Sequence, residues 1–391
     1  MNLRDRVERR RRDTAGPDLV RDWEALSPLV HVGEPSNRGP VVERLLDHLD
    51  PVFEDRLPPN GYVHGPAGTG KSAVVTALFE QLAAQPGAGR SVMYTTTRAE
   101  PRRQLQFVTV DGRTATSEFA FFRSVLDGLV AESVPEHGVG TAEVHDRIVS
   151  ALRGTDTGAV VAVDHVGEAG SLDAESLVEL VAELPSNTSW LAVGRTPPAE
   201  TLLSAYTGST VAFDPYDTQV LVDVLTTRAA TGLTRRGLPH EAARRIAEWA
   251  DGDAHDALAA LFVAADRAVE RDDLQITPRD VDDALDAVPR PSVSVSRLFA
   301  LPTNKRRVVR ALTDLSADER CSVSRTTTAV TGHPLVDLSE NTVERFLYEL
   351  AELGVVERVR APDATSSGRP PSRVELRFAP TLFRRLYDRR R

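Results

Sequence analysis

The clearest chemistry in this chain lies in one short glycine-rich stretch, GPAGTGKS at residues 65–72. It fits the pattern G-x-x-x-x-G-K-[ST] at every fixed position, in which glycines let successive backbone N–H groups point toward a phosphate. In this pattern Lys71 reaches the β- and γ-phosphates, and the hydroxyl of Ser72 ligates Mg²⁺. The stretch therefore predicts a site for a nucleoside triphosphate with Mg²⁺. The residues expected to hold the nucleotide are Gly65, Pro66, Ala67, Gly68, Thr69, Gly70, Lys71, Ser72 and Ala73.

The residues on either side of this stretch predict the strand and the helix that a phosphate site needs. Residues 61–64 (GYVH) read as a short strand, and residues 73–79 are apolar at helical spacing. A chance glycine-rich turn before a helix is the alternative interpretation. The combination of strand, loop and helix favours the phosphate site, because the helix N-terminus adds partial positive charge there.

A second strand predicts the other half of the site. Residues 159–163 (AVVAV) form an apolar run that is typical of a buried parallel strand, and Asp164 follows directly. A carboxylate at the carboxyl edge of the sheet would hold the water shell of Mg²⁺ beside the phosphates. We therefore expect Ser72 and Asp164 to serve the metal.

The order of elements predicts several domains. Strands alternate with helices from about residue 35 to residue 212, which indicates an α/β fold with a parallel sheet. The pattern then becomes all-helical, and a proline-containing linker follows at residues 288–292. The predicted parts are a flexible basic N-terminal segment at 1–34, a nucleotide-binding core at 35–212, an all-α lid at 213–288 and a C-terminal domain at 292–391.

The C-terminal domain has the pattern of a winged helix. We expect helices at 305–315 and 340–353, and two strands, 355–359 and 374–378, on either side of a basic tip at 366–373. In such a domain one helix enters the major groove of DNA, and the hairpin contacts the backbone or the minor groove. Many winged helices bind proteins instead.

The charge of this domain favours DNA. Residues 292–391 contain 18 Lys and Arg and 12 Asp and Glu, so their net charge is 18 − 12 = +6, whereas the whole chain carries −10. A basic part on an acidic chain indicates an anionic polymer as the partner. We expect double-stranded DNA, with Arg345 contacting bases and with Arg369 and Arg373 at the hairpin tip.

Composition excludes some other classes of protein. Cys321 is the only cysteine, so neither a disulfide framework nor a thiolate metal cluster is expected. No stretch approaches 18 uninterrupted apolar residues, and the first residues lack the apolar core of a signal peptide. The sequence therefore predicts no membrane partner and a cytoplasmic location.

The succession of core, lid and winged helix resembles the archaeal origin-recognition/Cdc-type replication initiators, which are AAA+ ATPases. The resemblance covers roughly residues 35–391, and its most specific pieces are VPEHG at 134–138, FDPYD at 213–217 and GDAHDAL at 252–258. It implies an AAA+ core and ATP as the nucleotide. It also implies ATP-dependent binding to origin DNA through the winged helix and an element of the core, with self-association on DNA as a further expectation.

Several positions depart from that family. His165 stands where the family has a water-activating glutamate, and Glu168 lies four residues after Asp164, so it would need an unusual backbone path to act as the base. Arg195 or Thr196 stands near the usual sensor-1 asparagine, and His255 matches the sensor-2 arginine. The region expected to hold an arginine finger, residues 202–210, contains no arginine. Because losing that arginine alone costs on the order of 10³–10⁵ in rate, we expect ATP to be bound but hydrolysed slowly.

Two other functions remain open at this point. One is a working AAA+ ATPase or remodeller in which His165 or Glu168 serves as the base. The other is a winged-helix transcription regulator whose P-loop core only senses nucleotide. Measuring ATP turnover with and without DNA distinguishes the working ATPase from a slow initiator. Counting genomic binding sites distinguishes the transcription regulator from an initiator, because an initiator binds one or a few origins.

Overall fold

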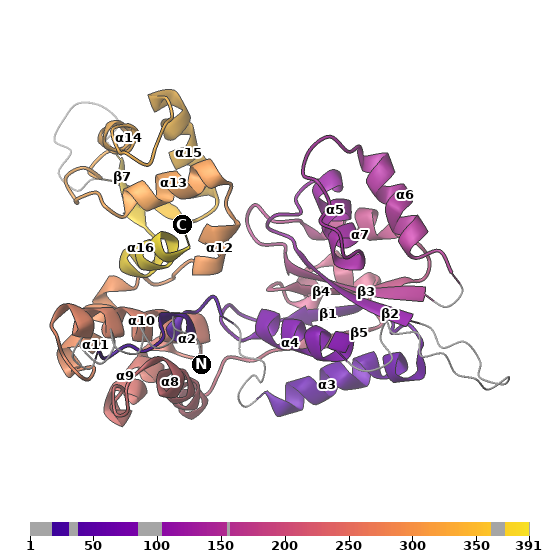
Figure 1. The fold of residues 1–391 in the computed structure, drawn as a ribbon, viewed down its shortest axis with the longest axis horizontal. Coiled ribbons are helices and arrows are strands. Elements are labelled where there is room, and N and C mark those ends of the chain that lie inside the picture. Colours follow the sequence, from indigo (N-terminus) through magenta and orange to yellow (C-terminus); the bar gives the residue numbers. More distant parts are fainter. Residues whose placement is uncertain (1–17, 31–37, 85–103, 155–156, 361–371, 391) are drawn as a thin grey trace, which may run out of the picture. The chain divides into compact units, whose positions relative to one another are not determined.

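The computed structural model describes residues 18–30, 38–84, 104–154, 157–360 and 372–390 (Figure 1). The chain divides into two compact units. One comprises residues 31–215, and the other combines residues 216–391 with the first 30 residues.

The unit of residues 31–215 is built on a five-stranded sheet with the order β2-β3-β4-β1-β5. Every neighbouring pair is parallel, so the carboxyl ends of all five strands lie at one edge. The predicted α/β fold with a parallel sheet is confirmed. The strands are β1 (Gly61–His64), β2 (Gln104–Asp111), β3 (Thr157–Val166), β4 (Thr188–Gly194) and β5 (Ser209–Ala212).

Helices cover both faces of this sheet, which explains the uninterrupted apolar run in β3. Val160 and Ala162 pack with helices α3 and α4, whereas Val161 and Val163 pack with α5, α6 and α7 on the opposite face. The α-helices of this unit are α3 (Gly39–Leu49), α4 (Lys71–Ala84), α5 (Glu118–Leu129), α6 (Thr141–Ala151) and α7 (Ala174–Ala182). Short 3₁₀ helices are η1 (Asp50–Glu54), η2 (Pro198–Glu200) and η3 (Leu202–Ala205).

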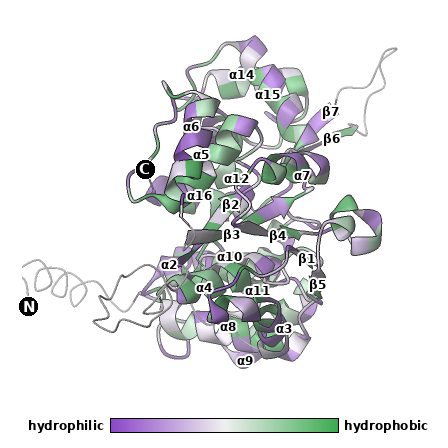
Figure 2. Cartoon of the chain, turned by 90° about the vertical axis from the view of Figure 1, so that its right-hand side faces the viewer, coloured by the Kyte–Doolittle hydropathy of each residue, from purple (hydrophilic) through white to green (hydrophobic). Residues whose placement is uncertain are grey.

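The other unit begins with the predicted lid, which contains four helices. Helix α10 is buried from Asp256 to Asp266 because α2, α8, α9, α11 and α16 all contact it. Helices in both units show green and purple residues side by side in Figure 2, as expected for one apolar and one polar face. The lid helices are α8 (Thr218–Gly232), α9 (His240–Ala250), α10 (Ala254–Glu270) and α11 (Pro278–Ala287).

The C-terminal part of this unit contains five helices and an antiparallel hairpin among its described residues. The expected helix at 305–315 begins and ends two to three residues earlier, and helices α12, α14 and α16 were not predicted. The elements are α12 (Val295–Ala300), α13 (Thr303–Leu312), α14 (Val323–Thr331), α15 (Glu340–Glu352), β6 (Val356–Arg360), β7 (Ser372–Leu376) and α16 (Pro380–Arg389).

The prediction of a flexible N-terminal segment at 1–34 is wrong for residues 18–30. Leu19, Trp23 and Leu26 are buried in the same apolar core as the lid helices, and the short helix α2 (Trp23–Leu26) contacts α8. An antiparallel bridge joins Val20 to Leu233. These three apolar side chains lie within eight residues, and the surrounding charged residues obscured the pattern in the sequence. The remaining residues of the predicted segment lie outside the described part of the chain.

Candidate nucleotide-binding site

The predicted phosphate loop connects β1 to α4 at the carboxyl edge of the sheet. Gly65, Gly68 and Gly70 have φ angles of 147°, 66° and 84°, a backbone conformation that other residues rarely adopt. A Cβ atom at Gly65 would collide with the backbone carbonyl of Phe213. Glycine is therefore required at this position by both its φ angle and its close neighbour, and Ser72 and Ala73 follow in the first turn of α4.

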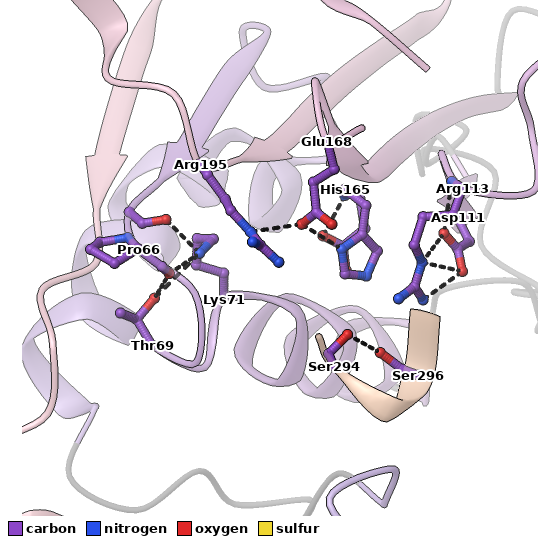
Figure 3. A network of polar contacts seen from close by, with 12 residues as sticks. Pro66, Thr69, Lys71, Asp111, Arg113, His165, Glu168, Arg195, Ser294 and Ser296 are labelled. Atoms are coloured by element: carbon purple, nitrogen blue, oxygen red, sulfur yellow. Dashed lines mark hydrogen bonds and ion pairs between the residues drawn. The ribbon is translucent and has the colours of Figure 1, made fainter. Parts of the chain in front are cut away.

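The side chain of Lys71 lies over this loop (Figure 3). Its Nζ atom donates to the carbonyl oxygens of Gly65 at 2.7 Å and Pro66 at 2.6 Å, and to Oγ1 of Thr69 at 3.3 Å. The Thr69 hydroxyl in turn donates to the Pro66 carbonyl at 3.0 Å. The ammonium group is buried and held at the loop, where it can meet a phosphate with little loss of side-chain entropy.

These residues fit a nucleoside triphosphate with Mg²⁺. The glycine backbone, the Lys71 ammonium and the N-terminus of α4 all favour negative charge at the same loop. No group of three His, Cys, Asp or Glu side chains in the described residues could hold a metal by itself. Proteins bind Mg²⁺ through one or two oxygens together with phosphates and water. Ser72 and Asp164 are oxygen donors of this kind.

Arg38 is a buried residue of this site that the sequence analysis missed. Its guanidinium donates to the carbonyl oxygens of Thr69 at 2.7 Å and Asp214 at 2.9 Å, and it lies 5.7 Å from the centre of the Phe213 ring. It therefore fastens the phosphate loop to the segment after β5 and adds positive charge close to the loop. Arg38 precedes α3 in an unremarkable polar stretch, so no sequence signal pointed to it.

His64, the last residue of β1, adds no charge to the loop at neutral pH. Burial lowers its pKa, the nearby Lys71 lowers it further, and Asp214 only partly opposes these effects. The imidazole is therefore neutral near pH 7, which leaves the cationic character of the loop to Lys71 and Arg38.

The end of β3 has an irregular backbone. The register with β4 shifts between Val163 and Val166, and His165 has a left-handed φ of 62°. The backbone N–H of His165 donates to Oδ1 of Asp164 at 2.7 Å. Gly167, with φ 76°, then donates to the carbonyl of Leu172 at 2.9 Å and closes the turn. This path turns the chain back and brings Glu168 beside His165.

His165, Glu168 and Arg195 form one network (Figure 3), and His165 also contacts Asp164. Nδ1 of His165 lies 3.1 Å from Oε1 of Glu168, and Nε2 lies 3.5 Å from Oδ2 of Asp164. Nε of Arg195 lies 2.9 Å from the same Oε1, and the Glu168 side chain is only 7 % exposed. Each ring nitrogen of His165 therefore faces a carboxylate, and Arg195 neutralises the more buried of the two.

Arg195 and Thr196 follow β4, the strand between β1 and β3 in the sheet. Figure 3 accordingly shows Arg195 between Lys71 and Glu168. The Thr196 carbonyl accepts a hydrogen bond of 2.7 Å from the hydroxyl of Tyr62, whose pKa burial raises to about 12. Tyr62 therefore remains a neutral donor and ties the end of β4 to β1.

Asp111 and Arg113 extend this row of polar residues to β2 and were also missed. Asp111 pairs in register with Asp164, and Arg113 donates to its carboxylate through Nε at 2.9 Å and Nη2 at 2.8 Å. Burial raises the pKa of Asp111, but the hydrogen bonds and charge of Arg113, together with the charge of His165, outweigh it and leave the pKa below its usual value. An aspartate at a strand end was the available signal, as it was for Asp164.

The other predicted residues belong to the other compact unit. His255 lies in the first turn of α10, in the other compact unit, and its sensor role stays a prediction. Arg345 is exposed on α15 with its Nε 3.5 Å from Glu349, and Arg373 of β7 forms an ion pair with Glu375. Arg369 falls outside the described residues.

Comparison with known families identifies the class of the core: residues 36–193 match the AAA ATPase domain family. The resemblance to archaeal replication initiators is confirmed as well. ORC1-type DNA replication protein 6 of Halobacterium salinarum is 24 % identical over 343 residues, which cover 83 % of this chain and 84 % of the relative.

Two solved structures share the fold over most of the chain. The Aeropyrum pernix Orc1 protein, determined in complex with DNA, superposes with a TM-score of 0.61 at 20 % identity, covering 95 % of this chain and 97 % of its own. Cdc6p from Pyrobaculum aerophilum gives a TM-score of 0.56 at 18 % identity, and the match covers 95 % of this chain and 99 % of the Cdc6p chain. No helix among the described residues is long and apolar enough to cross a membrane.

Proposed function

We propose that this protein binds ATP with Mg²⁺ and recognises double-stranded DNA at replication origins, and that it hydrolyses ATP slowly. The AAA ATPase domain and the geometry of its phosphate loop support nucleotide binding. The likeness to ORC1-type DNA replication proteins, and to an Orc1 protein determined with DNA, supports the role in replication.

Nucleotide binding would depend on three side chains of the core. Lys71 would turn from the loop carbonyls to the β- and γ-phosphates, a strong charge-assisted contact. Ser72 and Asp164 would hold Mg²⁺, directly or through its water shell. A bound Mg²⁺ would supply positive charge to neutralise the charge that develops on the phosphate oxygens.

The position of His165 between two carboxylates is the observation that carries slow hydrolysis. A general base must reach the attacking water with an available lone pair. Both ring nitrogens of His165 instead face Asp164 and Glu168, and Oε1 of Glu168 is shared with Arg195. These contacts hold the side chains against one another, so activation of water would require this network to rearrange.

DNA binding would come from the C-terminal part of the chain. Residues 292–391 carry a net charge of +6 in an acidic chain, and helices followed by a hairpin fit a winged helix. Arg373, the second residue of β7, and Arg369 would then contact DNA through the wing. Duplex affinity that stays unchanged in the Arg369→Ala, Arg373→Ala double variant at several salt concentrations would contradict this role of the hairpin.

The test of the whole proposal pairs nucleotide and DNA binding in full-length protein. Wild type should retain ATP, and Lys71→Ala should lose about a thousandfold in ATP affinity, because several charge-assisted hydrogen bonds of about 1.5–3 kcal/mol each disappear. The matched control is Lys305→Ala, since Lys305 is the only other lysine and lies on α13.

Duplex affinity should also differ between ATP-bound and nucleotide-free wild type, and Lys71→Ala should lose that difference. Nucleotide binding without any effect on DNA affinity would mean that the core serves another purpose.

Genome-wide binding at one or a few sites is expected, whereas binding at many promoters would indicate a transcription regulator. The number of protein molecules in each protein–DNA complex measures the predicted self-association.

A working ATPase is the second candidate, and the contact of 3.1 Å between Glu168 and His165 favours it. Here Glu168 would orient the imidazole and the pair would act as the base. Single-turnover hydrolysis distinguishes the two: a rate typical of AAA+ enzymes that Glu168→Gln lowers by about 10²–10⁴ supports the ATPase. A slow rate that this substitution leaves unchanged supports the slow initiator.

A further inference from the structure

The outward face of α15 is acidic, although the winged-helix pattern assigns this helix to the major groove. Glu340, Glu344, Tyr348 and Glu352 follow one another at intervals of four residues and are all exposed, whereas Val343, Leu347 and Leu350 are buried on an adjacent face. The helix contains four Glu and one Arg, so its net charge is 1 − 4 = −3. The inference below rests on the proposed binding of duplex DNA.

Such a face is poorly suited to enter a DNA groove. One glutamate can accept a hydrogen bond from a cytosine amino group. Three of them on one stripe bring like charge toward phosphates, and burying them there removes their hydration without supplying cations.

The one arginine of α15 does not reverse this charge. Arg345 is 66 % exposed, but its Nε lies 3.5 Å from Glu349 of the same helix, and its guanidinium lies 5.4 Å from the Phe346 ring. A phosphate or base would therefore compete with a carboxylate for this cation. Lys305 of α13 also pairs with Glu349, at 2.8 Å.

The neighbouring helix α14 has the opposite character. Its exposed residues are Ser324, Arg325 and Thr328, and the helix contains no acidic residue, although the Thr328 hydroxyl donates to Oε1 of Glu340 in α15 at 3.3 Å. The Arg325 guanidinium donates to Sγ of Cys321 at 3.7 Å, a weak contact that a phosphate would readily replace. Hydroxyls and an arginine on one helix face are the usual donors to the DNA backbone.

Helix α14 adjoins the hairpin, which adds further cations. The two elements contact each other, and the backbone N–H of Val374 in β7 donates to the carbonyl of Arg320 just before α14 at 3.0 Å. Arg358 of β6 and Arg373 of β7 are exposed, although Arg373 also forms an ion pair with Glu375. Arg358 also lies 4.5 Å from the ring of Tyr348, so the hairpin is tied to the acidic stripe by a cation–π contact rather than an ion pair.

We infer that duplex DNA is contacted by α14, through Arg325, and by the β6–β7 hairpin, and that α15 keeps its acidic stripe out of the groove. Binding in this mode depends on phosphate contacts, so it is sensitive to salt and selects sequence weakly through this domain. Of the arginines on these two helices, Arg325 rather than Arg345 then contributes most to duplex affinity.

The experiment compares two arginines of the full-length protein on a random-sequence duplex. Arg325→Ala should weaken binding about tenfold near physiological salt, and should make the dependence of log K on log salt less steep by about 0.9. Arg325→Lys should restore most of the affinity, because a phosphate contact needs charge more than geometry. Arg345→Ala is the matched control, also an exposed arginine on an adjacent helix, and should change affinity less than twofold.

Neutralising the acidic stripe tests the position of α15 directly. Glu344→Gln should leave duplex affinity within about twofold if the helix stays outside the groove, whereas a tenfold gain would place it against phosphates and overturn the inference. A larger loss in Arg345→Ala than in Arg325→Ala would overturn it as well. If wild type binds no duplex at all, the proposed DNA-binding function itself fails, and this inference with it.

Discussion

The carboxyl edge of the sheet has two halves that differ in structure and, under the proposed function, would treat a nucleotide differently. The half that follows β1 keeps every residue of the phosphate pattern, with Lys71 held over the loop. The half that follows β3 and β4 keeps Asp164 but carries His165 and Arg195 in a closed network with Glu168. The two halves are neighbours, because β4 lies next to β1 in the sheet.

The difference teaches that holding a nucleotide and turning it over depend on different kinds of structure. The phosphate loop works through backbone φ angles that only glycine provides readily, supported by one lysine. Hydrolysis depends on the identity and freedom of a few side chains, which can change without disturbing the loop. We therefore expect substitutions in one half to leave the other half intact.

The largest effect should follow from Gly65→Ala in the first half. The new Cβ would collide with the Phe213 carbonyl and force an alanine into φ 147°, so the free energy of unfolding should fall by about 3 kcal/mol and ATP binding should be lost. Chemical denaturation and ATP titration measure this. Gly138→Ala is the control, because it has φ 88° but nothing within 4 Å, and should cost only about 1 kcal/mol.

His165→Glu should give the next largest effect, in the opposite direction. A carboxylate at this position can act as a general base, so single-turnover ATP hydrolysis should rise about a hundredfold, with ATP affinity unchanged. His165→Gln removes the imidazole without adding a base and should produce no such gain. An equal rise in both variants would mean that loss of the His165 contacts, and not the new base, releases hydrolysis.

Arg38→Ala should weaken the first half by a smaller amount. It leaves the carbonyls of Thr69 and Asp214 without their guanidinium donor, which should lower the free energy of unfolding by about 2 kcal/mol and ATP affinity several-fold. Arg44→Ala is a close control, since Arg44 also donates to a carbonyl, that of Ala212, but at an exposed position. Equal losses in the two variants would contradict a special role for Arg38.

The smallest effect concerns Asp111 and pH. Its pKa is lower in the folded protein, so it stabilises the fold above the unfolded pKa of about 4, and this stability is lost as pH falls through the folded pKa. Asp111→Asn should reduce stability near pH 7 by about 0.5–1 kcal/mol, a modest value because the carboxylate is partly solvated. Unfolding curves between pH 2 and 7 should then depend less on pH in the variant.

The predictions from sequence succeeded for local backbone structure, whereas the roles of the site residues stay predictions. The phosphate loop, the parallel sheet and the position of Asp164 near the end of β3 follow from short stretches of sequence. The spacing of glycines and apolar residues in each stretch indicates one kind of local structure. The predictions failed where contacts join distant residues. Arg38 reaches Asp214 across 176 positions, and Leu19 to Leu26 pack on lid helices about 200 residues away.

By itself, then, the sequence determined the phosphate loop and the alternation of strands and helices, because glycine φ preferences and apolar periodicity act over a few residues. Only the tertiary structure decided what His165 and Glu168 do. A left-handed residue and a register shift in β3 turn the chain so that His165 faces two carboxylates, and β4 brings Arg195 alongside. Such geometry depends on neighbouring strands, which a linear pattern does not specify.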